Sequence, residues 1–190
     1  MSTTIIVSNP SKNSFSEEVL NSVIDGLSSK NKIYDVIDLY EDKFNPVMTK
    51  EEVNLYSKGE TKDTLVKKYQ AILKESDEII FIFPIWHNNV PAILKGFFDK
   101  VFVKEFAFIE ENKRPKGLLI NIKSGMVITT SETDTDFIKN ELGNPIENAI
   151  IKGTLNVVGM SNIKWLNNNL ANENPNAKKA YLENIKNYIS

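Results

Sequence analysis

The sequence predicts a doubly wound α/β fold, in which a mostly parallel five-stranded sheet carries helices on both faces. Short β-branched, apolar runs alternate along the chain with segments whose apolar residues recur at helical spacing, a pattern typical of βαβ units. The apolar runs are nearly continuous, as expected for strands covered on both faces. No internal repeat or interdomain linker interrupts the 190 residues, so residues 1–190 are expected to form one domain.

The first half of the chain supplies two strands and one helix of this scheme. Residues 3–8 (TTIIVS) predict a buried strand that runs into the polar loop SNPSKNS. Residues 15–27 carry apolar side chains at helical spacing, and Gly26 marks the end of that helix. Residues 32–39 (KIYDVIDL) predict a second strand, and residues 40–59 a long connection.

The second half continues the alternation. Helices are expected over residues 63–75, 89–102 and 176–189, and strands over residues 79–83 (IIFIF), 126–130 (MVITT) and 154–160. The Asn-rich stretch 167–176 is expected to be a loop before the last helix. The predicted strand order in the sheet is 2-1-3-4-5.

Composition excludes several classes of site. Apolar residues make up 41% of the chain and charged residues 25%, as in an ordinary globular protein, and the net charge of -2 gives no reason to expect nucleic acid as a partner. There is no cysteine and only one histidine, which excludes disulfides, thiol nucleophiles and multi-histidine metal sites. No signal peptide and no long apolar run is recognisable, so we expect no membrane insertion and a cytoplasmic location.

Two loops are expected to meet where a ligand would bind. In doubly wound sheets, ligands bind at the carboxyl ends of the strands, where the strand order reverses. For the order 2-1-3-4-5 that position lies between the first and third strands, so the loops concerned are residues 8–16 (SNPSKNSFS) and 83–90 (FPIWHNNV).

The first loop is rich in hydroxyl and amide groups and opens a helix. It contains neither G-x-G-x-x-G nor a Walker lysine motif. The N–H groups of the helix start, together with the hydroxyls, would suit a phosphate. The alternative is that Ser14 or Asn13 merely caps the helix, with Glu17 completing a capping box around Ser14.

The second loop offers a flat aromatic face. Trp86 could lie against a planar ring, and the helix that follows adds partial positive charge. The alternatives are core packing for Trp86 and an exposed turn position for His87, which has no recognisable orienting partner and is only a secondary catalytic candidate. A phosphate on one loop and a ring on the other indicate FMN, with FAD as the alternative. Such a cofactor would carry the redox chemistry itself.

Several stretches resemble one family. FPIWHNNVPAILKGFFDKVF (83–102) is the strongest match, and SDEIIFIF, DLYEDKFNPVMTKEE (38–52), SNPSKNSFS and EFAF (105–108) are further matches. They resemble the flavodoxin-like NAD(P)H:quinone oxidoreductases, a group that includes quinone reductase, modulator-of-drug-activity proteins and the ancillary subunit of potassium-efflux systems. The resemblance covers residues 3 to about 165.

The resemblance implies a set of cofactor contacts. The flavin phosphate and ribityl chain would be surrounded by Asn9, Ser14, Phe15 and Ser16. Along the isoalloxazine would lie Pro84, Ile85, Trp86 and His87, and beside its far edge Thr129, Thr130, Ser131 and Glu132. This last stretch reads TTSE where the family has T-T-G-G, so a carboxylate stands where the family has glycine. The Tyr and His that some quinone reductases place after this loop have no counterpart here.

The function implied is that of an FMN-dependent NAD(P)H oxidoreductase. By ping-pong hydride transfer, the nicotinamide would reduce the flavin at N5, and a quinone or another small aromatic acceptor would then take its place. The alternatives are a regulatory flavoprotein subunit of a membrane potassium-efflux system and a flavodoxin-type electron carrier. A homodimer is implied as well, and the apolar helix over 90–102 is expected to supply its interface, unless the 40–60 segment covers that helix within one chain.

Overall fold

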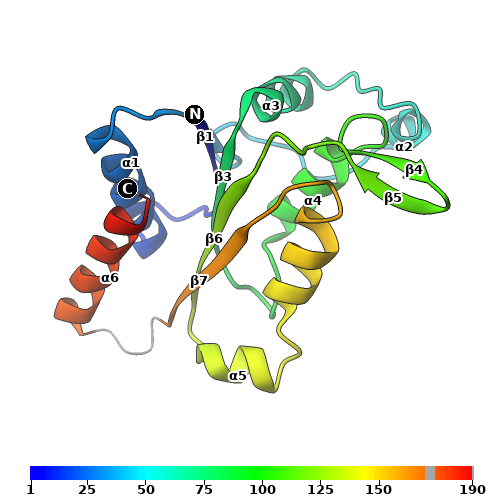
Figure 1. Ribbon diagram of the computed structural model, residues 1–190. Helices are drawn as coiled ribbons and strands as arrows, with labels where there is room; N and C mark the ends of the chain where they lie inside the picture. The colour runs from blue at the N-terminus through cyan, green and yellow to red at the C-terminus, as the bar shows by residue number, and fades with distance from the viewer. Residues whose placement is uncertain (170–173, 190) are drawn as a thin grey trace.

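The computed structural model describes residues 1–169 and 174–189, and its centre is a parallel five-stranded sheet (Figure 1). The order β2-β1-β3-β6-β7 is the predicted 2-1-3-4-5 arrangement. The sheet strands are β1 (Ser2–Val7), β2 (Ile33–Asp38), β3 (Glu78–Pro84), β6 (Ser124–Ser131) and β7 (Ile163–Asn169). The doubly wound fold is therefore confirmed.

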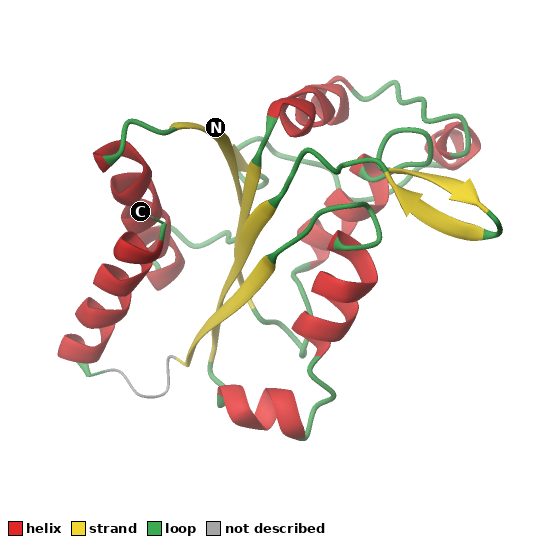
Figure 2. Ribbon diagram, in the orientation of Figure 1, coloured by secondary structure: helices red, strands yellow, loops and turns green. Residues whose placement is uncertain are grey.

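Helices cover both faces of this sheet (Figure 2). On one face lie α1 (Phe15–Ser29) and α6 (Pro175–Tyr188), which pack against each other. On the other lie α3 (Thr64–Glu75), α4 (Ala92–Val101) and the π-helix η1 (Ile146–Leu155). Each face has its own apolar core, since Ile6, Phe81 and Phe83 point into one, and Ile5 and Ile80 into the other.

Burial along the strands follows from their place in the sheet. The central strand β3 is buried on both faces, which explains the continuous apolar run IIFIF. The edge strand β2 leaves Ile33 71% exposed. The other edge strand, β7, pairs only with β6 and ends in three asparagines.

The prediction of a strand over residues 154–160 is wrong. The last residues of η1 and the turns after it occupy this stretch, and the fifth strand lies later, at Ile163–Asn169. Burial of Ile151, Leu155 and Val158 follows a helical period, which outweighs the β-branched character of the segment. The predicted loop 167–176 is wrong for residues 167–169, which belong to β7, and residues 170–173 lie outside the described residues.

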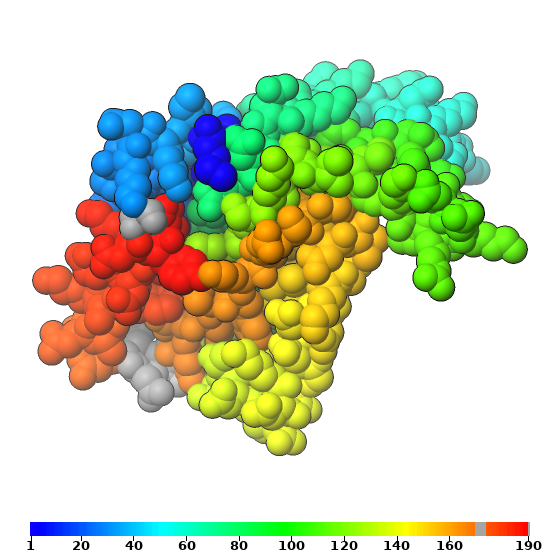
Figure 3. Space-filling model, viewed as in Figure 1, coloured from blue at the N-terminus to red at the C-terminus, as the bar shows by residue number. Residues whose placement is uncertain are grey.

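Four further elements were not expected. The connection 40–59 contains α2 (Lys50–Tyr56), started by a capping box between Thr49 and Glu52. A hairpin of β4 (Phe108–Glu111) and β5 (Arg114–Gly117) projects from the body of the molecule (Figure 3). The short helix α5 (Thr135–Asn140) follows β6 at the carboxyl edge of the sheet.

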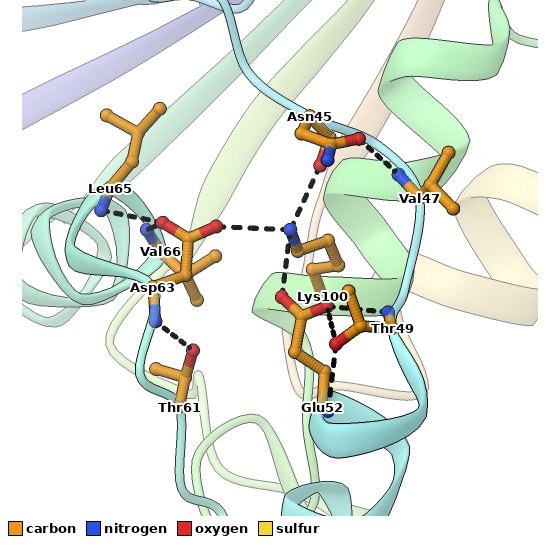
Figure 4. A network of polar contacts seen from close by, with 9 residues as sticks. All are labelled: Asn45, Val47, Thr49, Glu52, Thr61, Asp63, Leu65, Val66 and Lys100. Atoms are coloured by element: carbon orange, nitrogen blue, oxygen red, sulfur yellow. Dashed lines mark hydrogen bonds and ion pairs between the residues drawn. The ribbon is translucent and has the colours of Figure 1, made fainter.

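The 40–60 segment covers α4 within one chain. Pro46 packs against Gly96, where an added Cβ would lie 2.3 Å from the Pro46 Cβ. The buried Lys100 ammonium bonds the Asn45 carbonyl (3.0 Å) and pairs with Glu52 (2.9 Å) and Asp63 (3.1 Å) (Figure 4). The large apolar residues expected to form the interface are at most 8% exposed within one chain, so the argument that they need a second chain as cover is wrong. They are Val90, Ile93, Leu94, Phe97, Phe98, Val101 and Phe102.

Candidate functional site

Two cavities lie at the carboxyl edge of the sheet, on either side of the point where the strand order reverses. The larger, of about 620 Å³, is lined by Pro84, Ile85, Trp86, His87, Asn88, Thr130, Ser131, Glu132, Thr133, Ile138 and Leu142. The smaller, of about 210 Å³, is lined by Val7, Asn9, Pro10, Ser11, Lys12, Ser14, Ser16, Glu17, Leu20, Asp38, Tyr40 and Glu41. The two loops predicted from the topology therefore each line a cavity.

A tight turn presents Trp86 to the larger cavity. Trp86 and Asn89 exchange backbone hydrogen bonds of 2.9 Å in both directions. The two residues between them, His87 and Asn88, have φ of 48° and 60°, as in a type I′ turn. Because this turn occupies residues 86–89, α4 begins at Ala92, after Pro91, and not at residue 89 as expected.

Trp86 and His87 both lie exposed on the cavity wall. Trp86 is 42% exposed, which excludes the alternative that it packs in the core. His87 is exposed as well, and among the described residues no hydrogen bond orients its ring. The positive φ of His87 follows from its place in the turn, and its imidazole stays a secondary catalytic candidate.

Strand β6 forms the opposite wall. It is tied to the Trp86 turn where the Ile85 N–H donates to the Thr130 carbonyl at 2.8 Å. Thr130, Ser131 and Glu132 line the cavity, and Glu132 is exposed. These three predicted residues are thus brought together with the four residues 84–87 of the β3 loop.

Thr129 does not line either cavity. Its hydroxyl accepts from the Trp165 Nε1–H at 2.8 Å and bonds the Asn167 side chain at 2.6 Å, and the residue is fully buried. The Asn167 amide also donates to the hydroxyl oxygens of Ser131 (2.8 Å) and Thr135 (2.9 Å). These bonds between β6 and β7 fix the cavity wall from behind.

A third wall was missed from the sequence. Ile138 of α5 and Leu142, which follows that helix, line the cavity. The Asn88 Nδ2 donates to the Leu142 carbonyl at 3.0 Å and so joins this wall to the Trp86 turn. A signal was present in the sequence, since Asp134 caps α5 through the N–H groups of Asp136 and Phe137.

The smaller cavity keeps its polar groups available. Ser14 stands at the N-cap of α1, yet its side chain bonds none of the helix N–H groups and accepts from the Asn9 amide at 2.8 Å. The capping box expected as the alternative is absent, since Glu17 accepts from the Asn13 N–H. The buried hydroxyl of Ser8, the first residue of this loop, has no partner among the described residues.

The carboxylates of the smaller cavity are already engaged. Asp38 accepts from two backbone N–H groups of its own turn, at 3.0 and 3.1 Å. Glu41 pairs with Lys12 at 2.7 Å, and this bond lowers the pKa of the Glu41 carboxyl and raises that of the Lys12 ammonium. Burial raises the pKa of Tyr40, whose phenol therefore stays protonated. The remaining hydroxyl, amide and helix N–H donors suit a phosphate group.

Phe15 lies outside both linings. Its ring packs 5.9 Å from that of Tyr181 on α6 and lies under the Lys178 ammonium, 4.8 Å away. Its side chain therefore joins α1 to α6, and only its backbone stands at the helix start.

Within the described residues, no helix is long and apolar enough to cross a membrane. In the same part of the chain, no three acidic, histidine or cysteine side chains gather as metal ligands would.

Comparison with known proteins agrees with the fold. The family model for the flavodoxin-like fold matches residues 1–189. An NAD(P)H:quinone oxidoreductase from Methanothermobacter marburgensis superposes with a TM-score of 0.88 at 25% identity, covering 100% of this chain and 97% of that one.

Two relatives of named activity match by sequence. A relative from Haemophilus influenzae, named an uncharacterized NAD(P)H oxidoreductase, is 30% identical over 67% of this chain and 63% of its own length. An FMN-dependent NADH:quinone oxidoreductase of Coprothermobacter proteolyticus is 33% identical over 50% of this chain and 48% of its own length. The matches thus span about half to under two thirds of these relatives.

Proposed function

This chain belongs to the flavodoxin-like family, which includes NAD(P)H:quinone oxidoreductases, and we propose that it is an FMN-dependent NAD(P)H oxidoreductase. The observation that carries the proposal is the cavity of about 620 Å³ walled by Trp86, next to a donor-rich loop at the start of α1. A planar ring with a phosphate tail needs these two features side by side. The relative from Coprothermobacter proteolyticus is named for the same cofactor.

FMN would be held from both cavities. Asn9, Ser14 and Ser16, with the backbone of Phe15, would bind the phosphate and the ribityl chain. Pro84, Ile85, Trp86 and His87 would line the ring on one side, and Thr130, Ser131 and Glu132 on the other. Thr129 would act only through its bonds to β7.

The side chains around the larger cavity would position and shield the reactants. FMN, when bound, supplies the hydride chemistry, so no protein base is required. Trp86 would give a flat face for an aromatic reactant, and Ile138 and Leu142 would exclude water beside it. One cavity of this size suits a reductant and an acceptor that enter in turn, as in ping-pong kinetics with a quinone or another small aromatic acceptor.

The first test is spectroscopic. The purified protein should be yellow and release FMN, identified by its mass, and anaerobic NADH or NADPH should bleach the absorbance of the bound cofactor. An electron carrier would keep its colour under these conditions. A colourless protein that takes up no FMN would contradict the proposal.

A second test addresses the phosphate loop. In the double variant Asn9→Ala/Ser14→Ala, FMN affinity should fall by more than about tenfold, since each hydrogen bond to a charged group contributes roughly 1.5–3 kcal/mol. Riboflavin, which keeps the ribityl chain but lacks the phosphate, should lose much less affinity than FMN does. Equal losses for both ligands would show that the loop does not hold a phosphate.

A further inference from the structure

One residue of the larger cavity has a charge that the fold does not require. Glu132 directly follows the end of β6 and brings a carboxylate to the cavity mouth. Among the described residues of this lining, the other ionisable side chain is His87, and neither lysine nor arginine is present. No salt bridge engages Glu132 within the described part of the chain.

The segment that begins at Glu132 and forms this wall of the cavity also carries mostly negative charges. Residues 132–145 (ETDTDFIKNELGNP) contain the carboxylates Glu132, Asp134, Asp136 and Glu141 against a single lysine, Lys139. The Lys139 ammonium lies 5.3 Å from the ring centroid of Trp165, on the β7 side of α5. The charged side chains of this wall are therefore predominantly negative.

We propose that Glu132 makes this cavity selective by charge, so that neutral or cationic aromatic acceptors are favoured and anionic ones are disfavoured. The inference rests on the proposed function, because it names the substrate class of the same cavity. A single negative charge several ångströms from an anionic acceptor, in partly hydrated surroundings, would weaken its binding by roughly threefold to tenfold. The dihydronicotinamide ring is itself uncharged, so a reductant could still enter.

Two acceptors that differ only in charge test the proposal. The probes are a neutral naphthoquinone and the same ring carrying one sulfonate, and binding is measured by calorimetry on the protein as purified, at pH 8, where histidine side chains are ordinarily neutral. Glu132→Gln keeps the size of the side chain and removes its charge. In this variant the affinity for the sulfonate, taken relative to that for the neutral quinone, should rise about threefold to tenfold.

Salt and a control variant complete the design. The gain in Glu132→Gln should shrink at high ionic strength, because screening weakens exposed charges. Glu141→Gln removes the same charge from the same wall without altering the lining and should give a smaller gain. The ratio of kcat/KM for the two quinones should change in the same order, since the intrinsic reactivity of each quinone cancels between variants.

The outcomes separate this proposal from the proposed function. If Glu132→Gln binds the sulfonate no better than the wild type does, or if Glu141→Gln gains as much, the assignment to Glu132 is wrong. Both binding measurements can be made even if NAD(P)H fails to bleach the protein. That failure would overturn the oxidoreductase function alone.

Discussion

Trp86 shows how a large apolar side chain can lie at the surface without being a packing defect. The residue is 42% exposed, and a turn of reciprocal backbone bonds fixes its position. Nothing in this geometry needs the indole for folding. The side chain is therefore free to face a ligand, as proposed.

The variant Trp86→Ala separates binding from stability. Cofactor or quinone affinity should fall roughly threefold to tenfold, because a stacked aromatic pair contributes about 0.5–1.5 kcal/mol beyond its buried area. The melting temperature should change little, since the lost side chain was exposed. Unchanged affinity and turnover in this variant would remove Trp86 from the proposed site.

His87 should matter through its backbone and not through its imidazole. Its φ of 48° is tolerated by asparagine, so His87→Asn should keep both fold and NAD(P)H turnover. His87→Val should lower the free energy of unfolding by about 1–2 kcal/mol, because a β-branched residue resists positive φ. Turnover of the two variants and their denaturant unfolding are the measurements. A large loss of kcat in His87→Asn would restore the histidine as a catalytic candidate.

At the scale of elements, Lys100 holds three helices together (Figure 4). Its ammonium lies on α4 and pairs with Glu52 of α2 and Asp63 at the N-cap of α3. Burial alone would raise the pKa of Glu52 and of Asp63. The bonds that they accept from Lys100 and from backbone N–H groups outweigh burial, so both pKa values lie below the ordinary range.

Lys100→Met should cost about 3 kcal/mol of unfolding free energy, because two carboxylates remain close together without their cation. This is the lower end for buried pairs, since the side chains of Glu52 and Asp63 keep 17% and 25% exposure. A lowered carboxyl pKa stabilises the fold above the ordinary carboxyl pKa of about 4 and loses that contribution as the pH falls through the lowered value.

Urea unfolding at several pH values checks this prediction. The difference between wild type and Lys100→Met should be largest above about pH 4 and narrow in more acidic solution, where the carboxyls become protonated in both proteins. A difference that stays constant down to low pH would mean that the lysine acts by packing alone.

A single side-chain bond joins the wall formed by residues 132–145 to the Trp86 turn. Asn88→Gly removes the bond to the Leu142 carbonyl and tolerates the φ of 60° at this position. Since one such bond contributes about 1 kcal/mol, opening of this wall should become roughly fivefold more frequent. Amide hydrogen exchange of α5 should report it, together with a higher KM for the acceptor. Unchanged exchange would show that the packing of Ile138 suffices to hold the wall.

At the scale of the whole molecule, α4 is covered by its own chain, and the dimer implied by the family resemblance needs another interface. We still expect a homodimer, and light scattering should give twice the monomer mass over the micromolar range. The variant Gly96→Ala should unfold more easily, because its Cβ would collide with Pro46 inside one chain. A mass of one chain at all concentrations would contradict the dimer.

The sequence by itself determined the strand order, the two loops at its switch point, most of the lining of the larger cavity and half of that of the smaller one. These follow from local signals: the apolar runs 3–8 and 79–83, the helix start within residues 8–16 and the stretch 83–91, which has a proline near each end. Such patterns depend on backbone sterics and on which residues within one short segment become buried. The sequence of that segment alone therefore predicts them.

Tertiary structure decided the rest, because it depended on partners distant in the sequence. Ile163–Asn169 is a strand because β6 offers a free edge, although its asparagines suggest a loop. The Thr129 side chain does not line the cavity, because its hydroxyl is hydrogen-bonded to Trp165 and Asn167. The Leu142 carbonyl accepts a hydrogen bond from Asn88 of the Trp86 turn, which is 54 residues away in the sequence. No local pattern can predict such a contact.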